Sequence, residues 1–371
     1  MTLRIPTDLL PADGRFGSGP SKVPAGRLEA LAATGASLMG TSHRQQPVKD
    51  LVQRVRRGLA ELFALPDGYE VALGNGGSVA FFDLVTYALV RERSQHAVFG
   101  EFGKKFATAA QAAPWLADPA LVQSAPGGLA VPSYDVGVDV YAWTHNETST
   151  GVMAPVTRPE GASADQLTII DATSAAGGLP LDPGQADVYF FAPQKSFASD
   201  GGLWLALLSP AAIARAEEIA ASGRHIPAFF GLTEAIRQSR AGQTVNTPAV
   251  ATLFLMAEQV DWMNSQGGLA GMVQRTTASA EALYSWAEKS EYATPFVSDP
   301  SHRSLVVGTI ELDPSIDKDT VRAVLAANGV VDLDAYRGIG TNQLRIAMYP
   351  AVDASDVVAL TACLDWVVER L

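Results

Sequence analysis

Two residues of this chain, Lys195 and Asp171, carry side chains that together could hold and activate a cofactor. Lys195 follows the short apolar run at 187–192, and Asp171 ends a second run that begins at 167. Such runs are typical of buried parallel strands, and ligands bind beyond the carboxyl ends of those strands. Pyridoxal phosphate needs a lysine to which it links and an acid that keeps its pyridine nitrogen protonated. A surface lysine and a helix-capping aspartate are the alternative interpretation.

Four polar segments lie where strands end or helices begin, at 41–44 (Thr-Ser-His-Arg), 74–78 (Gly-Asn-Gly-Gly-Ser), 145–151 (His-Asn-Glu-Thr-Ser-Thr-Gly) and 246–248 (Asn-Thr-Pro). The glycines and the free N–H groups of the following helix would suit a phosphate at 74–78, although neither G-x-G-x-x-G nor a P-loop lysine is present. Arg44 could make a bidentate contact to an anion. Each segment could also be a polar loop or a helix cap.

Composition narrows the class of protein. The chain has 371 residues, 47% hydrophobic and 18% charged, which is typical of a globular protein large enough for two domains. A net charge of −12 without a basic run argues against nucleic acid or membrane as a partner. One cysteine, Cys363, excludes a disulfide framework and a cysteine-based zinc site, and we expect no metal. Without a signal peptide or an apolar span, we expect a cytoplasmic enzyme.

The order of apolar patterns predicts an α/β protein in two parts. From residue 17 to about 260, helical and strand patterns alternate, as in a parallel sheet. Helices are predicted at 48–63 and 78–90, and strands at 70–73, 96–99, 138–143, 167–170, 187–192 and 203–208. The helix at 249–263 is apolar on most sides and should be buried or lie at a subunit interface. The remainder predicts a small, mostly antiparallel α/β domain with helices at 270–288, 318–328 and 353–371 and strands at 304–312 and 343–348.

Taken in order, these motifs resemble the phosphoserine aminotransferase family, which are fold-type I, class-V pyridoxal-phosphate enzymes. The resemblance extends from 16–21 (Phe-Gly-Ser-Gly-Pro-Ser) to 343–346 (Gln-Leu-Arg-Ile), and it rests on the Ser-His-Arg and Asn-Glu-Thr loops, Asp171, Gln194-Lys195 and Asn246-Thr247-Pro248. It implies a large cofactor-binding domain, residues 17–262, with a mostly parallel seven-stranded sheet. It also implies a smaller C-terminal α/β domain, residues 263–371, on which residues 1–16 pack.

The family pattern implies a role for each matching residue. Lys195 would bind pyridoxal 5'-phosphate and move the proton between substrate and cofactor, and Asp171 would pair with the pyridine nitrogen. Of the other implied cofactor contacts, Phe102 would stack on the ring and Thr148 would lie at the phenolic oxygen. The cofactor phosphate would be bound by Gly77, Ser78 and Gln194. Asn246 and Thr247 would reach that phosphate from the neighbouring subunit of a homodimer with composite sites. The implied ligands of substrate anions are His43, Arg44, Arg337 and Arg345.

Three positions depart from the family pattern. Phe102 stands where many relatives have tryptophan, and Val79 follows the glycines where relatives often carry an arginine. The loop before the last arginine has Tyr336-Arg337 instead of a His-Arg pair, with altered length. Which residues complete the pocket for the substrate phosphate therefore stays open.

The resemblance implies that 3-phosphohydroxypyruvate and L-glutamate are converted to O-phospho-L-serine and 2-oxoglutarate in serine biosynthesis. Some relatives also act on 4-phosphohydroxythreonine in cofactor synthesis. The two main substrates share an α-carboxylate and differ in the distal anion. We predict that Arg345 binds the shared carboxylate, and that His43 and Arg44 bind the distal anion.

Other functions stay open at this point. An alanine–glyoxylate-type aminotransferase would have less need of phosphate-binding groups. A cofactor-binding protein without transaminase activity would fail to react with glutamate. A cysteine desulfurase has a similar fold but needs a catalytic thiol, for which Cys363 is badly placed. A nicotinamide dehydrogenase would require the missing G-x-G-x-x-G.

Overall fold

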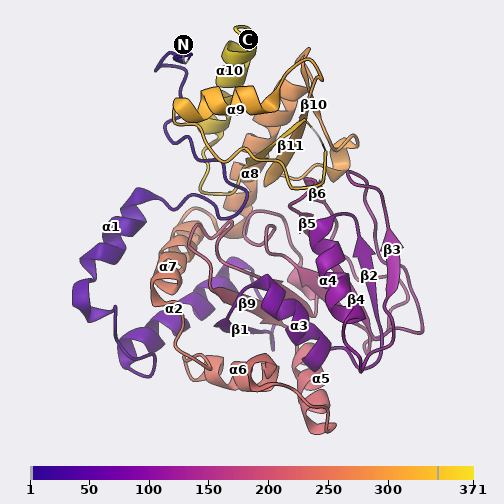
Figure 1. Ribbon diagram of the computed structural model, residues 1–371. Coiled ribbons are helices and arrows are strands. Elements are labelled where there is room, and N and C mark those ends of the chain that lie inside the picture. The colour runs from indigo at the N-terminus through magenta and orange to yellow at the C-terminus, as the bar shows by residue number, and fades with distance from the viewer. Residues whose placement is uncertain (1–2, 341) are drawn as a thin grey trace.

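A seven-stranded sheet lies at the centre of the larger part of the molecule in the computed structural model, which describes residues 3–340 and 342–371 (Figure 1). The strand order is β1-β9-β8-β7-β4-β2-β3. Strand β9 pairs antiparallel with β1 and β8, and the four remaining pairings are parallel. The predicted mostly parallel sheet is thus confirmed. Its strands are β1 (Glu70–Asn75), β2 (Ser94–Val98), β3 (Ala120–Gln123), β4 (Val140–Thr144), β7 (Leu167–Asp171), β8 (Val188–Phe191) and β9 (Leu203–Leu208).

Helices cover both faces of this sheet, which explains why its central strands are apolar throughout. Neighbouring residues of a strand point to opposite faces, so Phe190 and Phe191 belong to two different core clusters. The cluster around Phe191 includes residues of α2 (Gln46–Leu62) and α7 (Val250–Ser265). The cluster around Phe190 includes residues of α3 (Ser78–Ala88), α4 (Glu101–Gln111), α5 (Pro210–Ala221) and α6 (Leu232–Arg240).

A second, three-stranded antiparallel sheet forms near the C-terminus, as predicted. Its strands are β10 (Ala293–Pro295), β11 (Val307–Leu312) and β12 (Gln343–Ala347), and its helices are α8 (Gly268–Ala287), α9 (Lys318–Ala327) and α10 (Ala354–Val368). The N-terminal segment packs against this part, because Ile5 and Phe16 are buried in its core cluster. Both chain ends lie at this end of the molecule (Figure 1). The domain limits at 17–262 and 263–371 stay predictions, and residue 262 lies inside α7.

Several predicted bounds were wrong by a few residues. The strand predicted at 304–312 begins at Val307, because the hydroxyl of Ser304 accepts hydrogen bonds from the backbone of the next residues and holds a turn there. The strand predicted at 138–143 runs from Val140 to Thr144. Several elements of the large part were not predicted at all: the helices α1 (Ala25–Ala33), α4, α5 and α6, and the strands β3, β5 (Asn146–Glu147) and β6 (Val152–Met153).

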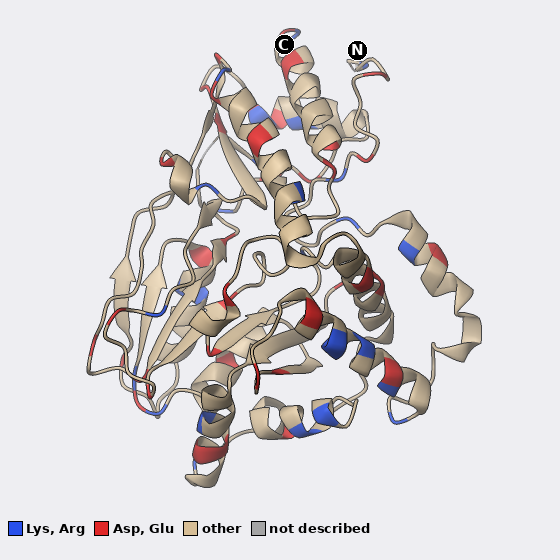
Figure 2. Cartoon of the chain, turned by 180° about the vertical axis from the view of Figure 1, so that it is seen from behind, with Lys and Arg blue, Asp and Glu red and all other residues tan. Residues whose placement is uncertain are grey.

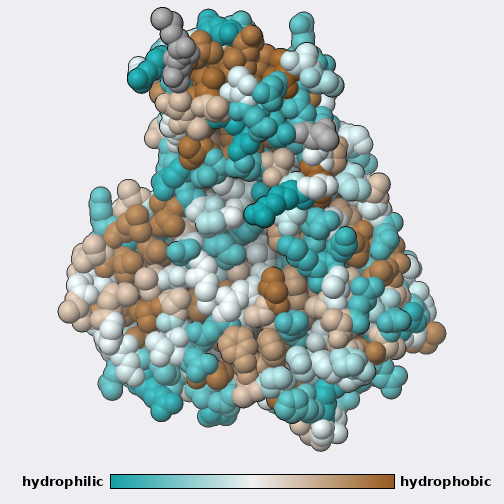
Figure 3. Space-filling view, in the orientation of Figure 1, coloured by the Kyte–Doolittle hydropathy of each residue, from teal (hydrophilic) through white to brown (hydrophobic). Residues whose placement is uncertain are grey.

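One helix stands apart from the core. Helix α1 (Ala25–Ala33) has no buried residue, and 48% of Leu28 is exposed. Figure 1 shows α1 projecting from the flank of the large sheet, and apolar side chains gather over the same flank in Figure 3. Figure 2 shows acidic and basic residues interspersed along the helices. No helix within residues 3–340 and 342–371 has the length and apolar character needed to cross a bilayer.

Candidate active site

Lys195 and Asp171 line one cavity of about 360 Å³, as their positions after β8 and at the end of β7 predicted. The N-terminal segment closes one side of this cavity through Gly19 and Pro20. Seven of the predicted site residues come together here: Gly77, Ser78, Phe102, Thr148, Asp171, Gln194 and Lys195. Because they derive from distant parts of the sequence, the cavity is built by the sheet as a whole.

The amine of Lys195 is buried, and 7% of the residue is exposed. Its Nζ donates to the backbone oxygen of Ser18 at 2.5 Å, an oxygen that also accepts from the hydroxyl of Tyr349 at 3.0 Å. Burial, together with the positive charge of Arg345, lowers the pKa of Lys195 to about 7 against the opposing charges of Asp171 and Glu147. A large fraction of this lysine is therefore a neutral nucleophile near neutral pH.

The carboxylate of Asp171 is fixed by one oxygen only. Its Oδ1 accepts from the backbone N of Thr173 at 3.0 Å and from the hydroxyl of the same residue at 2.5 Å. Within residues 3–340 and 342–371, Oδ2 has no such donor. Burial raises the pKa of Asp171 to about 6, although the bonds from Thr173 lower it. A cation facing Oδ2 would stabilise the ionised form, as a protonated pyridine nitrogen does.

A network of hydroxyls surrounds this pair. Ser78 and Thr173 share a hydrogen bond of 2.5 Å between their hydroxyls. Ser174 accepts from Asn146 Nδ2 and from Thr148 Oγ1, each at 2.8 Å. Thr173, Ser174 and Asn146 also line the cavity, but no role was predicted for them. The signal was present, because two hydroxyl residues stand two and three positions after the aspartate at the end of an apolar strand.

Glu147 is a further residue whose importance the sequence did not reveal. Its carboxylate has no exposed surface and accepts from the backbone N of Phe102 at 3.2 Å and of Gly103 at 3.0 Å, and from the hydroxyl of Ser149 at 2.6 Å. Burial raises the pKa of Glu147, and these hydrogen bonds oppose the rise. Glu147 thereby caps α4 and fixes Phe102, whose ring lies 5.9 Å from Lys195 Nζ.

Four predicted residues do not line the cavity of this chain: His43, Arg44, Asn246 and Thr247. Two of them lie together, since Nδ1 of His43 is 3.1 Å from Oγ1 of Thr247. The backbone oxygen of Thr247 accepts from Asn75 Nδ2 at 2.8 Å. Arg44 and Asn246 are exposed. These residues therefore form a separate polar group near the chain's surface.

The last two predicted residues, Arg337 and Arg345, line a second cavity of about 550 Å³. Arg345 Nη1 donates to the backbone oxygen of Thr148 at 3.1 Å, and Thr148 belongs to the first cavity. Phe102, which also lines the first cavity, contacts Tyr336 of the second with ring centroids 5.5 Å apart. The two cavities are therefore neighbours that share a wall.

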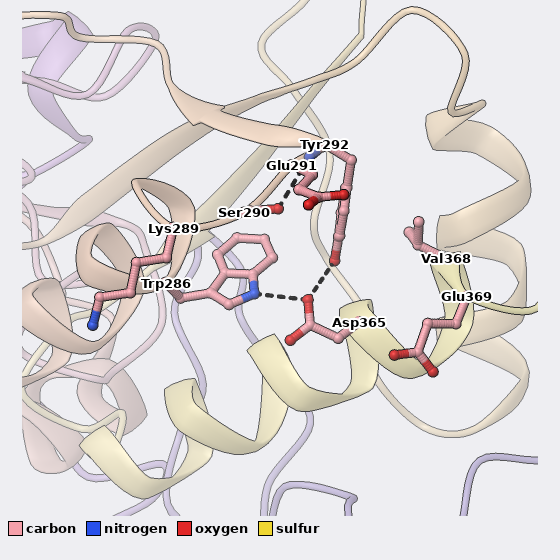
Figure 4. A pocket seen from close by; sticks show the side chains of 8 residues that line it. All are labelled: Trp286, Lys289, Ser290, Glu291, Tyr292, Asp365, Val368 and Glu369. Carbon is pink, nitrogen blue, oxygen red and sulfur yellow. Dashed lines mark hydrogen bonds between the residues drawn. The ribbon is translucent and has the colours of Figure 1, made fainter.

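A third hollow lies between α8, β10 and α10 and contains none of the predicted site residues (Figure 4). Trp286 Nε1 and the hydroxyl of Tyr292 both donate to Asp365 Oδ1, at 2.9 and 2.8 Å. These bonds join α8, the residue before β10 and α10. Cys363, in the same part of the chain, is fully buried, and burial raises the pKa of its thiol to about 11. That environment does not suit a catalytic thiol.

Comparison with known proteins defines the class first. The model of the aminotransferase class-V family matches residues 133–359, more than half of the chain. A phosphoserine aminotransferase of Nocardioides sp. strain JS614 is 67% identical over 370 residues, which cover all of this chain and 99% of that protein. The chain therefore belongs to the phosphoserine aminotransferase family of the class-V aminotransferases.

Solved structures agree with the fold. A phosphoserine aminotransferase from Cytophaga hutchinsonii superimposes with a TM-score of 0.88 at 22% identity, covering 97% of this chain and 99% of that one. A phosphoserine aminotransferase from Trichomonas vaginalis, solved with bound pyridoxal phosphate, gives a TM-score of 0.76 at 18% identity, covering 95% of this chain and 99% of that one.

Pyridoxal phosphate is the cofactor that the family implies, and the first cavity fits it. An amine and a carboxylate face the same space, and hydroxyls of three different segments surround it. Two buried polar atoms on its wall, Gln194 Oε1 and Asn146 Oδ1, have no hydrogen-bond partner among the described residues. Helix α3 begins at Ser78 without a side-chain cap, so its first N–H groups are free for a phosphate.

Proposed function

We propose that this chain transfers the amino group of L-glutamate to 3-phosphohydroxypyruvate, forming 2-oxoglutarate and O-phospho-L-serine in serine biosynthesis. The observation that carries the proposal is a cofactor cavity that shares a wall with a cavity lined by Arg337 and Arg345. Neither arginine has a carboxylate within ion-pair distance in the described part of the chain. Substrates with two anionic ends require such cations next to the reacting carbon.

Within the first cavity, each residue would act at a defined atom. Lys195 Nζ would hold the cofactor and, once the substrate's amine has displaced it, would accept the proton from the substrate's Cα as a base and donate it again as an acid during the transfer of the amino group. Asp171 Oδ2 would keep the pyridine nitrogen of the cofactor protonated, while Thr173 holds Oδ1 in place. Bound pyridoxal phosphate supplies the electron sink for the deprotonated carbon. Gln194 and the first turn of α3 would bind its phosphate.

The neighbouring residues would hold the substrate. Arg345, fixed by its bond to the backbone oxygen of Thr148, is next to the cofactor cavity and would bind the α-carboxylate that both substrates share. Phe102 would stack on the cofactor ring and exclude water from one face. Glu147 would maintain that ring position through its bonds to the start of α4.

We further propose a homodimer in which His43, Arg44, Asn246 and Thr247 complete the cavity of the partner subunit. Their grouping through the 3.1 Å contact between His43 and Thr247, outside the chain's own cavity, supports this. The exposed apolar side chains of helix α1 and the segment that follows it, Leu28 at 48% and Met39 at 47%, provide surface for such an interface. The cytoplasmic location expected from the sequence is also part of this proposal.

Two half-reactions test the proposed function. Purified holoenzyme is mixed with L-glutamate alone, and the absorbance change of the cofactor should show complete conversion to its amino form. Addition of 3-phosphohydroxypyruvate should then restore the original spectrum and release O-phospho-L-serine, which phosphorus NMR identifies. A spectrum that does not respond to glutamate would reject transamination and favour a cofactor-binding protein. Restoration by glyoxylate or pyruvate but not by the phosphorylated acid would favour an alanine–glyoxylate-type enzyme.

A further inference from the structure

The cavity next to the cofactor site has a third cation that the family pattern does not assign. Lys105, on α4, lines this cavity together with Tyr336, Arg337 and Arg345. One carboxylate also lines it, that of Asp334, but this group pairs with Arg322. In a chain with a net charge of −12, the cavity thus concentrates positive charge.

The ammonium group of Lys105 is held by aromatic groups instead of a carboxylate. Its Nζ donates to the hydroxyl of Tyr336 at 2.9 Å and lies 5.0 Å from the ring centre of Phe102. Within residues 3–340 and 342–371, no acidic group is within ion-pair distance of it. An ammonium donates three hydrogen bonds, so two donors stay available for a ligand, and its full charge is not neutralised.

Tyr336 connects these groups in one arrangement. Its ring contacts Phe102 edge-on with centroids 5.5 Å apart, and the guanidinium of Arg345 lies 5.5 Å from the Tyr336 ring centre. Since its hydroxyl oxygen accepts from Lys105, its proton can be donated to another acceptor. A tetrahedral dianion in this cavity would therefore meet donors from α4, from the Tyr336 loop and from Arg345.

We propose that Lys105, oriented by Tyr336, binds the distal phosphate of the acceptor substrate and so determines the preference for a phosphorylated acid; this inference rests on the proposed function. The Phe102 ring lies near both amines, because Lys105 Nζ is 5.0 Å and Lys195 Nζ 5.9 Å from its centre. Lys105 is therefore beside the ring that would cover the cofactor. A phosphate that extends from a substrate bound at the cofactor would meet it there.

The test compares Lys105→Met with Lys104→Met, which removes the same charge from the adjacent position of α4 but not from this cavity. Acceptors are 3-phosphohydroxypyruvate and 3-hydroxypyruvate, with glutamate as donor. We expect Lys105→Met to lower kcat/KM for the phosphorylated acid roughly ten- to hundredfold, with less than a twofold change for the other acid. Inhibition by inorganic phosphate should weaken by a similar factor. Lys104→Met should leave kcat/KM for both acids and the inhibition by phosphate unchanged. Lys105→Arg should retain most of the preference for the phosphorylated acid.

The outcomes separate this inference from the proposed function. If the native enzyme uses both acceptors equally well, the proposed function itself fails. If the native enzyme prefers the phosphorylated acid and Lys105→Met keeps that preference, the role of Lys105 is wrong and the function stands. Equal losses of kcat/KM on both acceptors in Lys105→Met would also overturn the role of Lys105 in phosphate binding, because they would show that Lys105 only holds the Tyr336 loop against α4.

Discussion

Burial determines the pKa of Lys195. Lys195 was predictable because an apolar strand ends just before it, but its pKa was not, because that value depends on groups far apart in the sequence. Ser18 holds the amine and Arg345 lies near enough to repel its positive charge, and neither proximity follows from a local pattern. The sequence therefore predicted where this lysine lies, while only the fold shows which groups lower its pKa.

The pH dependence of cofactor binding follows from this environment. With a pKa of about 7, the amine of Lys195 is protonated and unreactive below that pH and neutral above it. The rate at which cofactor-free enzyme binds pyridoxal phosphate should rise with pH with a midpoint near 7, as followed by absorbance. Arg345→Gln should move the midpoint to higher pH, since removing a positive charge raises the pKa of the lysine. Arg337→Gln is the control. A midpoint that does not move in Arg345→Gln would contradict this account.

The position of Gly19 leads to a second prediction at the level of single residues. A Cβ atom on Gly19 would lie 2.4 Å from Lys195 Nζ, and its φ of +149° is also unfavourable for other residues. Gly19→Ala should therefore displace the amine and lower kcat at least about tenfold, a barrier increase of about 1.4 kcal/mol. Gly201→Ala, where a Cβ atom would meet nothing within 4 Å, is the matched control. Full activity of Gly19→Ala would show that the N-terminal segment does not fix the lysine.

Helix α4 shows how one element positions the site and why the sequence missed it. Its first turn is capped by Glu147 and Ser149 from another segment, and its own N-cap residue, Gly100, has no side chain. Without a local capping residue, the usual start signal is absent. Strand β3 was missed because its residues are alternately half-buried and exposed, so it has no continuous apolar run. The fully buried apolar strands β8 and β9 were predicted, although the antiparallel direction of β9 depends on tertiary pairing.

The capping of α4 can be tested through stability. Glu147→Gln replaces an acceptor by an amide whose NH₂ group faces backbone N–H donors, so we expect a loss of roughly 1–3 kcal/mol in the free energy of unfolding. Urea denaturation of the holoenzyme measures it. Glu101→Gln, in the first turn of the same helix, should cost at most about 1 kcal/mol. If the two variants are equally stable, Glu147 does not hold α4 in place.

At the scale of the whole molecule, the proposed composite active site predicts that two inactive variants can complement each other. Lys195→Ala and Asn246→Asp should each be inactive or nearly so as pure proteins. After mixing in equal amounts with exchange of subunits, half of the dimers are mixed and each has one intact site. Activity should then recover to about a quarter of the native value. No recovery in a mixture that sedimentation shows to contain mixed dimers would mean that Asn246 serves its own chain's site.

Substrate preference is the central claim, and a single competition experiment tests it most directly. The holoenzyme receives limiting L-glutamate with equal concentrations of 3-phosphohydroxypyruvate, pyruvate and glyoxylate, and the amino-acid products are quantified by NMR. The product ratio equals the ratio of kcat/KM values, so it does not depend on any one kinetic constant. We predict that O-phospho-L-serine predominates by at least about two powers of ten, as expected for a site built to bind the distal anion. Alanine or glycine as the main product would contradict the assignment.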